Sequence, residues 1–213
     1  MRNSTVLEML ERGQIEELKR LLQDEIYQES LKSNPSAKKR YSAMKKYFKY
    51  YKPVRECLQK PCTVTFEDRK YISFTNSWSL ALTTEECGEI EMFDETTGKY
   101  PNVTRLIRFD GIKKKIDFHK VIAEAKSKGY KLNKSEVDFH FKYLMLYDGT
   151  YYKIGLIDAT FGIIDDGKPA MTYHPDGIRM PLTIKNDIGL CMIMPVKYEG
   201  DPEDDGKIVI EVE

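Results

Sequence analysis

The side chains that most often carry out chemistry in proteins are few in this sequence and widely spaced. The histidines and cysteines are His119, His140, His174, Cys57, Cys62, Cys87 and Cys191. No two histidines have the spacing of a metal pair on one helix, and the cysteines lack the short paired spacings of a zinc site. We therefore expect structural histidines, reduced cysteines, no metal and no cofactor.

Carboxylates and phosphate-binding loops give no stronger signal. Asp158, Asp165 and Asp166 lie close together in "DATFGIIDD", where a helix cap or a loop explains them better than acid–base catalysis does. The sequence has no glycine-rich phosphate loop and no nucleophile elbow. It therefore predicts a protein that is not an enzyme.

Basic residues are the one chemically active class that clusters. Between Lys32 and Lys60 ten basic residues accompany a single acid, Glu56, which gives a local net charge of +9 (10 − 1). On a helix, four lysines share a narrow sector about a quarter turn from an apolar stripe. The two sets are Lys38, Lys45, Lys49 and Lys52, and Tyr41, Met44, Phe48 and Tyr51. Two interpretations stay open: a solvated lysine face, or a surface that follows the phosphates of nucleic acid.

Composition indicates a folded protein without a membrane segment. The chain has 213 residues, its 34 basic and 34 acidic residues cancel, and 41% of its residues are hydrophobic. Acidic residues occur too early for a secretory signal, and no apolar run approaches the length that spans a bilayer. We expect a cytoplasmic protein with no membrane partner.

Helical periodicity occupies the front of the chain and one later segment. Residues 3–32 repeat Leu and Ile at steps of three and four, with Gly13 as a break, and residues 37–52 form a second pattern that ends at Pro53. We expect these two helices to pack as a hairpin. Residues 117–129 open on an aspartate cap and end on glycine, which predicts a third helix.

The remaining segments are typical of strands. The predicted strands are residues 62–67, 70–76, 79–84, 136–142, 142–148, 150–156, 169–174, 180–186 and 189–196, with 88–93 as a further candidate. The apolar run 156–164 is ambiguous between helix and strand. Helices among several consecutive strands favour an α+β fold with antiparallel sheet.

Four short segments, in the same order along the chain, resemble the bacterial sliding clamp, the β subunit of DNA polymerase III. They are "YISFTNSWSLAL" (71–82), "GKYPNVTRLI" (98–107), "YYKIGLIDATFGII" (151–164) and "RMPLTIKNDIGLCMIMPVKY" (179–198). The resemblance is to a strand–turn–strand unit, a connector, a helix and the terminal strands that end in Met-Pro. It implies a DNA-clamp-like fold of antiparallel sheets with packed helices, preceded by an N-terminal helical hairpin. The implied domains are residues 1–36, 37–198 and 199–213.

The resemblance also implies a function and a peptide site. A clamp-like protein, here a reduced form such as a phage or mobile element encodes, serves DNA replication by binding linear peptide motifs of replication proteins. Carried over by position, the pocket consists of Thr75, Ser77, Leu80, Pro101, Leu106, Met192, Met194, Pro195 and Val196. Ser77 stands where the family usually has glycine. Leu80, Leu106 and Met192 are equally compatible with plain core packing.

A DNA-contacting face is implied as well. Helix 37–52 takes the place of a pore-facing helix, and residues 117–129 add Lys120, Lys126 and Lys128 after the run Lys113 to Lys115. The predicted contacts with double-stranded DNA are Lys38, Lys45, Lys49, Lys52, Lys120 and Lys126. A homo-oligomer is an expected partner, because a clamp protomer has three domains and this chain is too short for that. Two alternatives remain, a general nucleic-acid-binding protein and an oligomeric structural module without a peptide site.

The C-terminal segment 199–213 is acidic and ends in an alternating pattern. It carries seven acids against Lys207, and "KIVIEVE" predicts an edge strand that pairs with a sheet of this chain or of a neighbour. A less favoured alternative places this segment over the peptide pocket. From sequence alone, removal of residues 200–213 is expected to leave the core folded.

Overall fold

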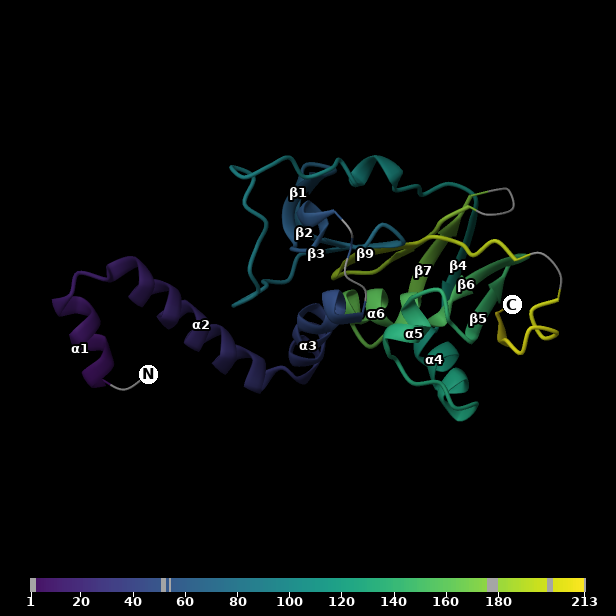
Figure 1. The fold of residues 1–213 in the computed structure, drawn as a ribbon, viewed down its shortest axis with the longest axis horizontal. Coiled ribbons are helices and arrows are strands. Elements are labelled where there is room, and N and C mark those ends of the chain that lie inside the picture. The colour runs from purple at the N-terminus through teal and green to yellow at the C-terminus, as the bar shows by residue number, and fades with distance from the viewer. Residues whose placement is uncertain (1–2, 51–52, 54, 176–179, 199–200, 213) are drawn as a thin grey trace.

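The chain folds into an α+β structure with one large antiparallel sheet and several helices (Figure 1). The computed structural model describes residues 3–50, 53, 55–175, 180–198 and 201–212. The helices are α1 (Asn3–Glu11), α2 (Ile15–Ser33), α3 (Pro35–Tyr50), η1 (Glu56–Leu58), η2 (Thr104–Leu106), α4 (Phe118–Ser127), α5 (Lys134–Val137) and α6 (Ile154–Ile164). The strands are β1 (Cys62–Phe66), β2 (Arg69–Thr75), β3 (Ser79–Thr83), β4 (Ile112–Ile116), β5 (Tyr143–Tyr147), β6 (Thr150–Lys153), β7 (Ala170–His174), β8 (Leu182–Lys185), β9 (Gly189–Ile193) and β10 (Ile208–Val212).

Two sheets organise these strands. The larger has the order β1-β2-β3-β9-β8-β7-β4, and its neighbouring strands are antiparallel. The smaller has the order β10-β5-β6, in which β10 runs parallel to β5. The β5–β6 turn is Asp148-Gly149, and both residues have positive φ, as a tight hairpin requires. The predicted α+β class with antiparallel sheet is confirmed.

Strands β3 and β9 lie at the centre of the large sheet, and both of their faces are buried. On β9, Cys191 and Ile193 join the apolar cluster on the helical side, whereas Leu190 and Met192 join a second cluster on the other side. This alternation follows from the two-residue period of a strand. The second cluster is closed by residues of the connector 100–107.

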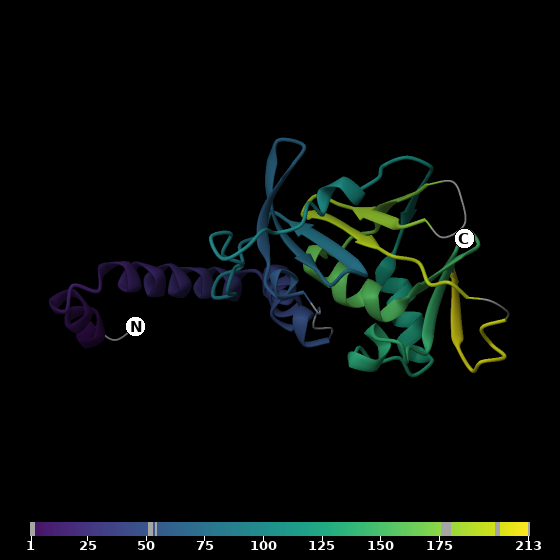
Figure 2. The same cartoon turned by 45° about the horizontal axis from the view of Figure 1, so that its top comes forward.

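Helix α6 resolves the ambiguous run 156–164. It is apolar around most of its circumference, and it packs between the large sheet and α3 (Figure 2). A helix that is apolar all round belongs in a core. The α3–α6 contact is close, because a Cβ on Gly162 would lie 3.3 Å from Ala43 Cβ. Asp158 and Gly162 are the partly exposed positions of α6.

The N-terminal helices form an arm. Gly13 has φ of +69° and separates α1 from α2, and Met9 and Leu18 are buried where the two helices meet. The last turns of α2 contact the body, where Tyr27 packs edge-on against Tyr41. The rest of α2 projects away from the body in both views (Figures 1 and 2). The predicted packing of α2 and α3 as a hairpin is not confirmed, since the two helices contact each other near their junction at Asn34 and the rest of α2 projects away (Figure 1).

Two predicted strands are absent, the last three residues of the predicted strand 150–156 belong to α6, and one strand was not predicted. Residues 136–142 form the end of α5 and a loop, because Asn133 caps α5 and the Glu136 carboxylate accepts hydrogen bonds from the backbone of Lys142 and Tyr143. Residues 88–93 form no strand. Strand β4 was not expected, since "IKKKI" has exposed lysines on both faces, as suits the sheet edge where it pairs with β7. Within the described residues, no helix is both long and apolar enough to cross a bilayer.

Candidate functional site

The pairing of β3 with β9 brings together segments that are far apart in sequence. Leu80 lies opposite Met192 and Ser79 opposite Ile193. Just beyond the pairing, Met194 N donates a hydrogen bond of 2.9 Å to Trp78 O. The connector joins them, because Tyr100, Val103 and Ile107 belong to the same apolar cluster as Leu80 and Met192. The three segments that the resemblance assigns to one site therefore meet in space.

The nine predicted pocket residues divide into an interior and a surface. Leu80 and Met192 are 1% and 3% exposed, and Thr75 is also buried, so these three are core beneath the site. Pro101, Met194, Pro195 and Val196 are partly exposed. Ser77 is exposed, and Leu106 is 50% exposed. For Leu80 and Met192 the structure thus favours core packing, whereas Leu106 lies at the surface.

The turn between β2 and β3 is held in a defined conformation. Asn76 Oδ1 accepts hydrogen bonds from Trp78 N (3.0 Å) and Ser79 N (2.8 Å). Ser77, at the tip, has φ of +75°, a conformation that glycine adopts most easily. This is the position at which the resemblance expects glycine.

A buried polar network ties the turn to the helices. Thr160 of α6 donates to Ser79 Oγ (2.8 Å), and the Tyr47 hydroxyl of α3 lies 2.9 Å from the same oxygen. Thr75 Oγ1 donates to Ser79 O (2.9 Å). Burial raises the pKa of Tyr47, so its hydroxyl remains a neutral donor. The turn is consequently anchored on three sides, and its orientation is fixed before any ligand arrives.

Next to the turn lies an aromatic corner that was not expected from the sequence. Trp78 is 38% exposed and Phe139 is 70% exposed, and their rings form an edge-to-face pair with centroids 6.3 Å apart. Phe139 comes from the loop after α5, in the segment predicted as a strand. Two adjacent exposed aromatic rings are unusual at a surface and are typical of contact sites. The only sequence signal was the large aromatic content of 136–142.

Lys153 lies beneath this corner. It is 7% exposed, and its Nζ donates to Asp138 O (2.7 Å). The same Nζ lies 4.6 Å from the Phe141 ring centroid and 5.7 Å from that of Trp78. Burial lowers the pKa of Lys153 to about 8, although Asp138 acts in the opposite direction. The Lys153 amine, which is half protonated near pH 8, therefore lies against the aromatic pair.

The chain's single tryptophan makes this titration measurable. We expect Trp78 fluorescence to change with a midpoint near pH 8, because the cation beside its ring is lost as Lys153 deprotonates. Lys153→Met should abolish the transition. The pKa of Lys153 is about 8 in the folded protein and near 10.5 in the unfolded chain. Between these pH values the unfolded chain binds more protons than the folded protein, so the free energy of unfolding rises with pH. A midpoint above pH 10, or one that persists in Lys153→Met, would contradict the assignment.

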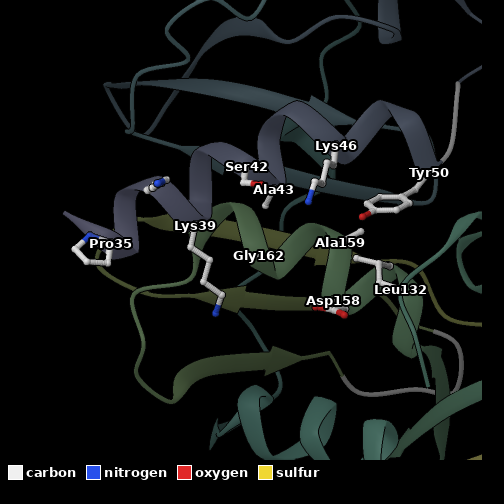
Figure 3. A pocket seen from close by; sticks show the side chains of 11 residues that line it. Pro35, Lys39, Ser42, Ala43, Lys46, Tyr50, Leu132, Asp158, Ala159 and Gly162 are labelled. Atoms are coloured by element: carbon white, nitrogen blue, oxygen red, sulfur yellow. The ribbon is translucent and has the colours of Figure 1, made fainter. Parts of the chain in front are cut away.

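The basic helix α3 borders a second candidate site. A groove of about 430 Å³ runs between α3 and α6 (Figure 3). Its lining residues are Pro35, Lys38, Lys39, Ser42, Ala43, Lys46, Tyr50, Leu132, Asp158, Ala159 and Gly162. In Figure 3 the side chains of Lys39 and Lys46 extend from α3 along the opening, and Asp158 lies at the opposite edge. A further cavity of about 420 Å³, bordered by Lys45 and Lys49, lies along another side of α3.

The charges where this groove meets the adjoining cavity, which Lys39, His119, Asp158 and Asp165 border, are partly paired. Asp165 contacts Lys39 Nζ (2.7 Å) and His119 Nε2 (2.9 Å). Burial alone would raise the pKa of Asp165, but the hydrogen bonds from Lys39 and Gly167 outweigh it and lower the pKa. Burial raises the pKa of Asp158, which Lys126 and Tyr130 oppose. The groove thus has a basic rim, and Asp158 is the single acidic side chain among its described lining residues.

The structure brings several of the predicted DNA-contacting lysines together. Lys38 and Lys46 border the α3–α6 groove, and Lys126 of α4 borders the adjoining cavity next to Lys39. Within the described residues, Lys38, Lys46, Lys49 and Lys126 form no ion pair shorter than 4.0 Å. Lys45 pairs with Glu89 at 3.8 Å and Lys120 with Asp117 at 3.9 Å. Lys52 lies outside the described residues.

The comparisons with known proteins do not assign the chain to a family. No family model, no curated protein and no solved structure matches it. Within the described residues, no group of three or more His, Cys, Asp or Glu side chains could hold a metal ion. The geometry on which a function can be argued is therefore that of the two surfaces described above.

Proposed function

We propose that this protein is a non-enzymatic, clamp-like binding protein that captures linear peptide motifs of replication proteins. The observation that carries the proposal is the β3–β9 pairing. It sets the turn 75–79 beside residues 192–196, and Leu80 and Met192 pack in one apolar cluster with Tyr100, Val103 and Ile107 of the connector. These segments resemble those that form the peptide pocket of sliding clamps. A chance resemblance of unrelated segments gives no reason for them to converge.

The chemistry of this surface suits a short apolar peptide. We name it the turn surface, and define it as Ser77, Trp78, Met194, Pro195 and Val196. Leu106, exposed on the connector, is a further predicted contact of the peptide. Met and aromatic side chains adapt to different apolar partners. Pro195 has no backbone N–H, and the regular strand ends at Ile193. The chain beyond it is held in place as a wall, because Met194 N donates to Trp78 O and Val196 N donates to Tyr151 O. The buried core beneath, with Leu80 and Met192, gives the wall a rigid support.

The test is a titration of a fluorescein-labelled peptide that carries the clamp-binding motif of a bacterial replicative polymerase. We expect saturable binding, weakened at least about tenfold by Trp78→Ala or by Leu106→Asp. Leu80 is unsuitable for substitution because a change there disturbs the core. Both chosen side chains are partly exposed, so the variants should fold.

The matched control is Ile112→Asp. Ile112 is 40% exposed, like Trp78, but it lies on β4 at the edge of the sheet, three strands away from β9. The Ile112→Asp variant should bind the peptide as the parent does. Absence of binding by the parent at high micromolar peptide, or equal losses in all three variants, would refute the proposed site.

A second candidate function is nucleic-acid binding, and the lysines around α3 are the observation that favours it. Lys38, Lys46 and Lys126 come from two helices and share neighbouring cavities. Such a surface contacts phosphates without reading sequence. Retention of double-stranded DNA that falls with salt, in a protein that binds no peptide, would favour this function over the first.

A further inference from the structure

The arm formed by α1 and α2 exposes an apolar surface that nothing in the chain covers within the described residues. Its exposed large apolar side chains are Leu7, Leu10, Ile15, Leu22 and Ile26, of which Ile26 is 68% exposed. On α2, Ile15, Leu22 and Ile26 fall within about 40° of one another around the helix. An exposed apolar stripe of this kind on a projecting helix is typical of a surface that binds a partner.

The arm is acidic as well as apolar. Helix α1 has two acids and no base, and α2 has five acids and three bases. The acids are Glu8, Glu11, Glu16, Glu17, Asp24, Glu25 and Glu29. The arm therefore requires a binding partner that is apolar in its middle and basic at its rim.

The α3–α6 groove has that character. Helix α3 carries six basic residues and no acid. The floor of the groove consists mainly of small or apolar side chains, among them Ala43, Ala159 and Leu132, and Gly162 adds no side chain at all. Small residues let a helix approach closely, and Lys38 and Lys46 line the rim of the groove.

The lengths also agree. The groove extends from Pro35 to Tyr50, which is about 22 Å along a helix at 1.5 Å per residue. The stripe from Ile15 to Ile26 is about 16 Å long by the same measure. The exposed part of α2 thus fits within the groove.

We propose that the α1–α2 arm of one copy of this chain docks by its apolar stripe into the α3–α6 groove of a second copy. Docking within one chain is excluded by the connection, because Asn34 alone joins α2 to α3 and holds the arm away from the groove. The two contacting surfaces differ, so the association is head-to-tail and produces chains or closed rings instead of a two-fold dimer. It occupies the lysines that the nucleic-acid candidate requires, and it does not depend on the peptide site.

The experiment uses two variants of the full chain. The arm variant is Leu22→Asp with Ile26→Asp, and the groove variant is Lys38→Glu with Lys46→Glu. All four side chains are exposed, so neither variant should unfold, which circular dichroism verifies. Light scattering over a concentration series gives the molar mass. We expect concentration-dependent assembly of the parent, weakening at higher salt, and an increase of at least about tenfold in the dissociation constant of each variant.

Mixing the two variants is the decisive step. The arm variant keeps an intact groove and the groove variant keeps an intact arm, so an equimolar mixture should form one-to-one pairs and grow no further. Lys70→Glu, on β2, is the control for charge reversal and should assemble like the parent.

Three results would overturn the proposal. The first is a parent that stays monomeric at all concentrations. The second is a groove variant that assembles as the parent does, which would indicate arm-to-arm association. The third is a groove variant that loses DNA binding but keeps its self-association, which would assign the groove to nucleic acid.

Discussion

Gly189→Ala is expected to lower the free energy of unfolding by at least about 3 kcal/mol. A Cβ at this position would lie 2.0 Å from Leu82 O and 3.1 Å from Thr83 Cα. Both are backbone atoms of β3 at the centre of the sheet, so no side-chain rotation can relieve the overlap. The strands would have to separate, and the pairing that places Met192 opposite Leu80 would be disturbed. For a chain of this size, the loss corresponds to a fall of about 6–12 °C in the melting temperature.

Gly98→Ala is the matched control. A Cβ there would meet only Phe93 Cζ, at 3.6 Å, and the backbone has no positive φ. Its melting temperature should stay within about 2 °C of the parent's or rise slightly, because alanine restricts the unfolded chain more than glycine does. Calorimetry gives the melting temperatures of the parent, Gly189→Ala and Gly98→Ala. Similar melting temperatures for Gly189→Ala and the parent would mean that β3 and β9 are not packed as closely as described.

The Gly189→Ala substitution also links stability to the proposed function. The turn surface is built on the β3–β9 pair, and Trp78 O bonds to Met194 N directly beyond it. A variant that separates these strands should therefore lose peptide affinity even where it remains folded. A loss of stability with unchanged peptide binding would place the peptide elsewhere on the molecule.

Sequence reasoning succeeded where local signals and the tertiary environment agree. The strands that became β1, β2, β3, β7, β8 and β9 were predicted from alternation and turn residues, and each is confirmed. Helix α4 was predicted from its cap, and Asp117 does accept hydrogen bonds from the His119 and Lys120 backbone. In these cases the neighbours in the fold only reinforce what the local sequence prefers.

It failed where burial or a distant partner decides. Residues 156–164 could not be assigned because a helix buried on all sides loses its amphipathic period. Residues 137–141 alternate Val, Phe and Phe as a strand does, but Val137 ends α5 and the Glu136 carboxylate accepts hydrogen bonds from the backbone of Lys142 and Tyr143, which closes the segment into a loop. Hydrogen bonds of this kind cannot be read from spacing alone.

For the candidate site too, some features could be predicted from the sequence and others depended on tertiary packing. The order of the four segments placed the turn beside the last strand, but it could not tell that Leu80 and Met192 lie in the core. That outcome depends on the connector, whose Tyr100, Val103 and Ile107 cover them. Phe139 and Lys153 reach Trp78 from two other elements, and no local pattern joins them. Sequence therefore indicated where the surface lies, and tertiary packing determined which side chains form it.

Ile210→Asp is expected to destabilise the protein by about 4 kcal/mol or more. Ile210 is 1% exposed and belongs to the apolar cluster on the helical side of the large sheet. It lies on β10, opposite Met145 of β5. A carboxylate there loses its hydration without gaining a partner. The acidic C-terminal segment therefore ends in a strand that contributes to the core, as well as pairing with a sheet edge of the same chain.

Val209→Asp is the control, because it changes the neighbouring residue to the same side chain. Val209 is partly exposed and points to the other face of the strand, so the cost should stay within about 1 kcal/mol. Urea unfolding followed by circular dichroism measures both. Removal of residues 200–213, which the sequence alone suggested the core would tolerate, should then be at least as damaging as Ile210→Asp. It deletes the whole of β10 and the bond from Lys207 Nζ to Phe141 O. Equal unfolding midpoints for the truncated chain and the parent would show that β10 adds nothing to the core, and would restore the expectation drawn from sequence.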